Sequence, residues 1–157
     1  MADIKTKYTS AANITITLAS LADDSKREST DVSNTVNLYL DALVHLKVKT
    51  GVSVSGDKAI YVYAYGCVDD NMGYSGDASG LDGAYSGNLD NCKLLGVIST
   101  PAAASTYLSD LMSVANAFGG VLPSAWGIIV HNKTGAALNG TEGNFEKKYG
   151  GILAQTG

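Results

Sequence analysis

A regular alternation of apolar and polar residues between Val36 and Lys49 constrains the fold of this chain more than any other feature of its sequence. Every even position from 36 to 48 holds Val, Leu or Ala, whereas the odd positions include Asn, Asp, His and Lys. Successive side chains of a β-strand point to opposite faces, so the pattern predicts one long strand with one face on a core and the other largely in water. A helix of the same sequence would scatter the apolar residues around its circumference.

Six shorter apolar stretches are interpreted as further strands. They are Asn13–Leu18, Lys58–Tyr65, Leu94–Thr100, Leu111–Phe118, Trp126–Asn132 and Glu146–Gln155. The residues between them favour turns, because Gly and Asn tolerate positive φ and Pro fixes φ at about −65°. Strands spaced about 8 to 20 residues apart are typical of a sandwich rather than of βαβ units. We therefore predict an all-β fold, an antiparallel, jelly-roll-like β-sandwich of seven or more strands.

The segment from Ser105 to Ala117 also fits a helix. Tyr107, Leu111 and Val114 recur at spacings of three and four, but the residues from 111 onwards alternate between two faces as well. The two periods cannot be separated over so short a segment. We favour a strand there, because it continues the sheet, and keep the helix as the alternative.

One domain accounts for the whole chain of 157 residues, because folded units cluster at about 100 to 200 residues and no linker divides this one. The polar residues 1–12 carry too little apolar surface to pack alone and are predicted to be a flexible N-terminal arm, with the sandwich over residues 13–157. The stretch Gly66–Asn91, called the excursion below, is rich in Gly, Asp, Asn, Ser and Tyr. It is too long for a hairpin turn, so we expect one long Gly/Asp-rich loop.

Charge and hydropathy argue against several kinds of partner. The chain has a net charge of −4 and a single arginine, Arg27, whereas nucleic-acid binding needs basic patches that displace counterions from phosphate. No apolar run approaches the roughly 18 residues of a membrane span, and the first residues lack a charged leader followed by an apolar stretch. We expect no nucleic-acid or membrane partner and a soluble product made in the cytoplasm.

The groups that usually carry chemistry are scarce. His45 and His131 are the two histidines, no G-x-S-x-G elbow exists, and most acids fall in expected loops, where carboxylates are usually solvated. The glycines of the excursion are not followed by the Lys-Ser or Lys-Thr pair of a phosphate-binding loop. Two cysteines without nearby histidines cannot complete a tetrahedral zinc site. We expect no catalytic site, no cofactor and no metal, and hence no enzyme.

A calcium loop is a minor alternative at the start of the excursion. The run Asp69-Asp70-Asn71 resembles the beginning of such a loop. The sixth and twelfth positions are Tyr74 and Gly80, however, where an EF-hand requires Gly and Glu.

Cys67 and Cys92 flank the excursion at the ends of two strands that could be neighbours in one sheet. A disulfide between them would close a loop of about 26 residues and stabilise the fold by roughly 3 to 4 kcal/mol on the chain-entropy model. A cytoplasmic product starts reduced, so two buried thiols are the competing interpretation. The sequence leaves both open.

Five tyrosines make up a candidate aromatic platform. Tyr61, Tyr63 and Tyr65 share one face of an expected strand, and Tyr74 and Tyr85 lie in the excursion. Tyrosine buries a large area and keeps a hydroxyl for hydrogen bonding, which suits a protein interface or a sugar site. The alternative is that the excursion itself covers these rings.

Four features together resemble small virion proteins of tailed bacteriophages: the short N-terminal arm, the alternating strand Val36–Lys49, the strand Ala59–Gly66 (AIYVYAYG) and the later segment Trp126–Leu138 (WGIIVHNKTGAAL). The likeness covers most of the chain and lies in a pattern of strands rather than in a catalytic signature. It implies a jelly-roll-like accessory subunit of the virion, such as a capsid decoration (cement) protein, often trimeric, on the outer shell.

The expected function is that of a structural virion protein that stabilises the shell, with a collar, tail or fibre component or a carbohydrate-binding module as alternatives. Its expected partners are the major capsid protein or another virion protein, and further copies of the chain. We expect the contacts to come from the N-terminal arm, from the segment Ala22–Asn34 and from the aromatic platform. The candidate interface residues are Ala2, Asp3, Ile4, Lys5, Tyr8, Tyr61, Tyr63, Tyr65, Tyr74 and Tyr85.

Overall fold

In the computed structural model, which describes residues 3–69 and 72–156, the alternating segment forms strand β5 (Asp41–Lys49). Ala42, Val44, Leu46 and Val48 have no exposed surface, which confirms the predicted inner face. Each of these side chains points into the space between two sheets, so burial of one face sets the register of β5.

The prediction that this strand begins at Val36 was wrong. Val36, Leu38 and Leu40 are exposed, because Asn34 closes a turn ahead of β5. The side-chain oxygen of Asn34 accepts a hydrogen bond from the N–H of Tyr39 (2.8 Å), and its amide donates to the Tyr39 carbonyl oxygen (3.0 Å). These local bonds replace the ladder bonds that a longer strand would have made.

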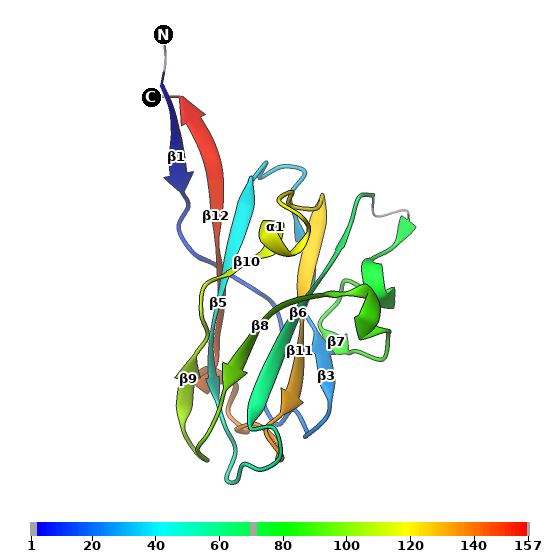
Figure 1. The fold of residues 1–157 in the computed structure, drawn as a ribbon, viewed down its shortest axis with the longest axis vertical. Coiled ribbons are helices and arrows are strands. Elements are labelled where there is room, and N and C mark those ends of the chain that lie inside the picture. The colour runs from blue at the N-terminus through cyan, green and yellow to red at the C-terminus, as the bar shows by residue number, and fades with distance from the viewer. Residues whose placement is uncertain (1–2, 70–71, 157) are drawn as a thin grey trace.

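Two antiparallel sheets of six strands each pack against one another, so the predicted all-β sandwich is confirmed (Figure 1). The first sheet contains β1 (Ile4–Tyr8), β2 (Ala12–Asn13), β5, β9 (Thr106–Leu108), β10 (Met112–Ser113) and β12 (Glu146–Thr156). The second contains β3 (Lys26–Glu28), β4 (Val32–Ser33), β6 (Ala59–Cys67), β7 (Gly83–Ala84), β8 (Lys93–Ser99) and β11 (Ala125–Lys133). Helical turns lie in the connections, at η2 (Ser75–Asp77), η3 (Leu89–Asn91), α1 (Val114–Ala117) and η4 (Glu142–Asn144).

The strand order is that of a jelly roll. In the first sheet β12 lies between β1 and β5, and β10 follows β5; in the second, β11 lies between β3 and β6, and β8 follows β6. The chain crosses from one sheet to the other at most connections, whereas β6 and β8 stay together and the excursion joins them. Such interlocked Greek keys make the first and last strands neighbours, although they are remote in the sequence.

The predicted strand Leu111–Phe118 is wrong from residue 114 onwards, because β10 ends at Ser113 and α1 follows it, so the alternative of a helix holds for residues 114–117. Asp41 accepts hydrogen bonds from the N–H of Ala115 (2.8 Å) and the hydroxyl of Ser113 (2.6 Å). Ser113 Oγ in turn accepts from the N–H of Asn116 (3.0 Å). These oxygens satisfy N–H groups that the start of a helix leaves unpaired, so the chain turns into α1 at this point.

The predicted strand Asn13–Leu18 is only partly confirmed. Ile14, Ile16 and Leu18 are buried in alternation, as expected for extended chain, but ladder pairing with β12 stops at β2. The backbone N–H of Leu18 instead donates to the carboxylate of Glu142 (2.9 Å).

Aromatic rings connect the two sheets through the core. Trp126 on β11 is fully buried and meets Tyr149 on β12 edge-on, with ring centroids 5.3 Å apart. Edge-to-face packing places the positive rim of one ring on the negative face of the other. This contact holds β12 against the second sheet at the level where β12 also pairs with β5.

Candidate interaction site

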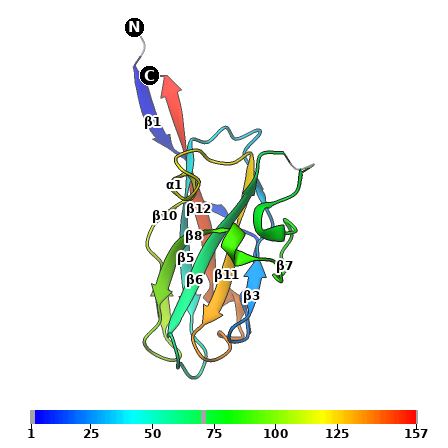
Figure 2. The same ribbon diagram turned by 45° about the vertical axis from the view of Figure 1, so that its right-hand side comes forward.

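The two ends of the chain form a paired ribbon that extends beyond the sandwich. Residues 146–152 of β12 pair with β5, whereas residues 152–156 pair with β1. Figures 1 and 2 show β1 and the end of β12 rising together, well past the other strands. We call residues 4–8 and 152–156 the terminal ribbon.

The predicted flexible arm is therefore wrong for residues 4–8, which are a strand. Ladder hydrogen bonds to β12 order this segment without any need for a buried apolar face of its own. Asp3 is exposed and precedes the strand, and the candidate residue Ala2 lies outside the described residues.

One face of the terminal ribbon is apolar and the other is cationic. Directly opposite residues of antiparallel strands share a face, so Ile4 and Tyr8 lie on the face that carries Ala154 and Ile152. Ile4 is 78% exposed and Tyr8 is 69% exposed. Lys5 and Lys7 lie on the other face, and the ribbon contains no acidic residue.

The outer edge of β1 has no partner strand among the described residues, because β1 is the last strand of its sheet. An open edge presents unpaired N–H and C=O groups that can add a further strand. A two-stranded ribbon alone in water is also marginally stable. Both properties suit a segment that binds another protein.

Further apolar side chains are exposed on the loops at the end of the sandwich from which the ribbon rises. They belong to the turn before β5, the residue after β6 and the loop between α1 and β11 (Figure 1). These residues are Val36, Leu38, Leu40, Val68 and Val121. Isolated apolar residues are normal on a surface, whereas a group of them at one end is a candidate interaction site. We call this surface, together with the terminal ribbon, the ribbon end.

An apolar hollow of about 300 Å³ lies in the ribbon end. Val68, Phe118, Val121 and Pro123 line it. Gly66 forms its floor, and a Cβ at this position would lie 2.8 Å from the Pro123 ring, so only glycine permits this close approach.

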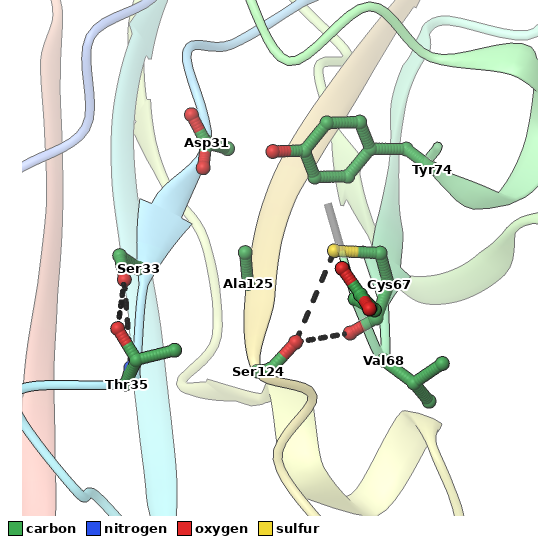
Figure 3. A pocket seen from close by; sticks show the side chains of 9 residues that line it. Asp31, Ser33, Thr35, Cys67, Val68, Tyr74, Ser124 and Ala125 are labelled. Atoms are coloured by element: carbon green, nitrogen blue, oxygen red, sulfur yellow. Dashed lines mark hydrogen bonds between the residues drawn. The ribbon is translucent and has the colours of Figure 1, made fainter. Parts of the chain in front are cut away.

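A polar pocket of about 410 Å³ adjoins the hollow, and both are lined by Cys67 and Val68. Figure 3 shows Asp31 on one side and the Tyr74 ring on the other, with the Tyr74 hydroxyl directed toward Asp31. Asp69 also lines the pocket. The Ser124 hydroxyl on its floor donates to the Cys67 carbonyl oxygen (2.9 Å). Among the described residues, no side chain forms a hydrogen bond or ion pair with the Asp31 carboxylate, so this carboxylate is accessible in the pocket.

The aromatic platform is divided by the excursion. Tyr65 and Tyr85 are buried, and with Cys92 and Ile129 they form a second small core, against which Tyr74 packs. The rings of Tyr65 and Tyr74 meet edge-on at 5.3 Å. Burial raises the pKa of the Tyr65 and Tyr85 hydroxyls above their usual range. Tyr65 and Tyr85 are therefore covered within the excursion, as the alternative interpretation held, whereas Tyr74 is half-buried and lines the polar pocket.

Tyr61 and Tyr63 remain half-exposed on the outer face of the second sheet. Tyr61 lies beside His131, with ring centroids 6.4 Å apart, and His131 Nε2 is 2.8 Å from Asp24 Oδ1. The hydrogen bond to His131 and the nearby charge of Lys133 lower the pKa of Asp24. This part of the predicted platform is accessible.

Two acidic residues, Glu28 and Asp82, hold the excursion in place, although neither belongs to a recognisable sequence motif. Glu28 is buried and accepts hydrogen bonds from the N–H (2.7 Å) and hydroxyl (2.9 Å) of Ser79. Asp82 accepts from Arg27 Nε (2.7 Å) and from the hydroxyl of Thr17 (2.6 Å). The expectation that the loop acids are solvated was wrong for Asp82, and nothing in the sequence points to either pairing.

Cys67 and Cys92 are both buried and free, so the disulfide that the sequence left open is not formed. Their surroundings differ, since Cys67 faces Ser124 and Cys92 Sγ lies 3.5 Å from the Tyr85 hydroxyl. Burial raises the pKa of the Cys92 thiol, which keeps it protonated and unreactive at neutral pH.

The segment Ala22–Asn34, expected to contact other subunits, is largely built into the domain. It contains β3 and β4, which both pair with β11. Ser29 is buried within the domain, and its hydroxyl oxygen accepts a hydrogen bond from the N–H of Ile128 (3.0 Å). Asp31 and Ser33 are the residues of this segment that line the polar pocket.

Over residues 3–69 and 72–156 no cluster of three or more His, Cys, Asp or Glu side chains is placed to hold a metal ion. The same residues contain no helix with the length and hydropathy of a membrane span. Comparison of the chain with protein-family models, with curated proteins and with solved structures found no match.

Proposed function

We propose that this protein is a structural virion protein of a tailed bacteriophage, most specifically a capsid decoration protein, and that it binds through its ribbon end. The observation that carries the proposal is the terminal ribbon, a projecting pair of strands with an open edge and an exposed apolar face. A segment of this kind gains stability only when another protein covers it. The major capsid protein is the partner that we propose, with other virion proteins as further candidates.

The fold is compatible with this role without proving it. Jelly rolls occur in viral capsid proteins and in lectins, among others, and a fold alone does not determine function. The proposal therefore rests on the site and on the resemblance of the strand pattern to phage accessory subunits. In this role the protein acts by burying surface area rather than by catalysis.

Co-sedimentation with phage shells tests the proposal. The purified protein should pellet with expanded shells of its phage, and deletion of residues 1–8 should abolish pelleting while leaving the circular dichroism of the sandwich intact. Val52→Ser is the matched control, because Val52 is 95% exposed at the opposite end of β5 and should have no effect. Equal pelleting of the deletion variant and the wild type would overturn the role given to the ribbon.

A carbohydrate-binding module is the second candidate, and the accessible tyrosines favour it. Tyr61 offers an aromatic face beside His131 and Asp24, which together could stack on and hydrogen-bond to a sugar. Glycan-array binding that disappears in Tyr61→Ala but persists after deletion of residues 1–8 would favour this function over the first.

A further inference from the structure

We propose that the apolar hollow and the adjoining polar pocket bind the terminal ribbon of a second copy of this chain. The inference rests on the proposed function, because it names the first occupant of the same surface. It would make the protein a cyclic assembly in which every copy gives one ribbon and receives another.

The ribbon cannot fill the hollow of its own chain. At its base the N–H of Thr9 donates to the Gly151 carbonyl oxygen (2.9 Å), and the N–H of Gly151 donates to Thr9 Oγ1 (2.9 Å). These bonds continue the ladder of β12 directly into the ribbon, which points away from the sandwich in both views (Figures 1 and 2). An occupant of the hollow must therefore come from another molecule.

The two faces of the ribbon match the two depressions of the ribbon end. Cys67 and Val68 line both the apolar hollow and the polar pocket, so the two depressions lie side by side with the exposed Val68 at their common border. A ribbon that approaches Val68 with the open edge of β1 would turn Ile4 and Tyr8 toward the hollow. The opposite face would then lie over the polar pocket.

Charge supports this orientation over the reverse one. Lys5 and Lys7 would lie over the pocket that contains Asp31 and Asp69, where opposite charges attract. The whole chain has a net charge of −4, so the ribbon is a cationic segment on an acidic protein. An acidic protein with a cationic projection is complementary to a copy of itself.

Symmetry allows all copies to bind in the same way. The ribbon and its receiving surface are different patches at one end of the molecule, so the contact is head-to-tail and closes into a ring when the rotation permits. A ring would cover the hollow of every copy and leave Val36, Leu38 and Leu40, which do not line the hollow, exposed for contact with the shell. It would leave the far end, with Val52, free.

Disulfide trapping between separately labelled copies tests the proposal. In a Cys67→Ser background, one protein carries Ile4→Cys and a second carries Val121→Cys, and the two are mixed under mild oxidation. A disulfide-linked heterodimer is expected, because the hollow that Val121 lines would hold Ile4 of the neighbour. A mixture of Ile4→Cys with Val52→Cys is the matched control, and equal cross-linking in both mixtures would overturn the proposal.

A charge exchange gives a second test that does not depend on new cysteines. The wild type should be an oligomer by light scattering, and the variant with Lys5→Glu and Lys7→Glu should associate at least about tenfold more weakly. Adding Asp31→Lys to that variant should restore part of the association, which a general loss of structure would not allow. A monomeric wild type, or no rescue, contradicts the inference.

Failure of this inference is distinguishable from failure of the proposed function. A monomer that still pellets with shells through residues 1–8 would remove the self-association and leave the virion role in place. A ring that does not bind shells would contradict the virion role and leave the self-association in place.

Discussion

The terminal ribbon and the excursion have opposite relations between composition and exposure. The excursion is polar and rich in glycine, yet it folds onto the sheet and covers Tyr65, Tyr85 and Ile129. The ribbon contains Ile4 and Tyr8, yet every side chain of β1 is exposed. Composition predicted an arm and a polar loop, and it did not indicate that the loop is the more closely packed of the two.

The difference lies in what anchors each segment. The buried carboxylate of Glu28 and the buried ring of Tyr65 lie beneath the excursion and contact it. Its glycines permit approaches that a Cβ would prevent, as at Gly76 against Cys92 Sγ. The ribbon has only the ladder of one neighbouring strand. The packed excursion and the projecting ribbon thus differ in contacts rather than in residue types.

Removal of a ring beneath the excursion should give the largest effect. Tyr65→Ala is expected to lower the free energy of unfolding by about 3 to 5 kcal/mol, because it leaves a cavity and frees the Ser29 carbonyl oxygen, which now accepts from the Tyr65 hydroxyl at 2.6 Å. Urea denaturation measures this change. Tyr61→Ala, on the same strand face but half-exposed, is the control and should lower the free energy of unfolding much less. Equal losses would show that the contacts beneath the excursion do not stabilise the fold.

The carboxylate anchor should give the next largest effect. Glu28→Gln removes one of the two oxygens that accept from Ser79, and we expect a loss of about 1 to 3 kcal/mol in unfolding free energy. In limited proteolysis, a protease should cleave the excursion of the Glu28→Gln variant faster than that of the wild type. Glu146→Gln, which disrupts an exposed ion pair with Lys47, should leave both stability and proteolysis nearly unchanged.

Acidification should loosen the excursion at Asp82. Burial opposes ionisation of this carboxyl, but hydrogen bonds from Arg27 and Thr17 outweigh burial and lower its pKa below the usual 3.8. Its contribution to stability is therefore present above pH 3.8 and is lost as the pH falls through the lower value of the folded protein. Thermal melting between about pH 5 and 2 should show a smaller decrease for Asp82→Asn than for the wild type. Parallel curves would show that the carboxylate does not anchor the loop.

Substitution of the ribbon should change folding stability least. Ile4→Ser with Tyr8→Ser is expected to alter the unfolding free energy of the monomer by no more than about 0.5 kcal/mol, because neither side chain is buried. The same variant should lose association in light scattering. A large loss of monomer stability would show that the ribbon packs within its own chain and would erase the contrast with the excursion.

Sequence periodicity predicted the sandwich and the inner face of β5, because burial of alternate residues leaves a direct trace in the chain. It overestimated the length of β5. The alternation begins at Val36, but the hydrogen bonds between the Asn34 side chain and the Tyr39 backbone form a turn there instead of a strand. It also missed the pairing of β1 with β12. That pairing depends on backbone bonds between segments almost the whole chain apart, which no local pattern records.

The candidate interface was predicted in part for the same reason. Tyr8 and Lys5 are exposed on the ribbon, as an interface requires, whereas Tyr65 and Tyr85 serve the internal packing of the excursion. The apolar residues of the ribbon end come from three separate loops. Only the folded chain brings Val36, Val68 and Val121 to one surface.

The pairing of β1 with β12 also has a consequence for the timing of biosynthesis. Residues 4–8 are translated before their partner strand, residues 152–156, which follows on the order of ten seconds later at usual elongation rates. The surface that we propose for assembly therefore cannot exist on a nascent chain that lacks β12. Products that are truncated before β12 would be unable to assemble, so the pairing of the strands excludes incomplete chains from the assembly.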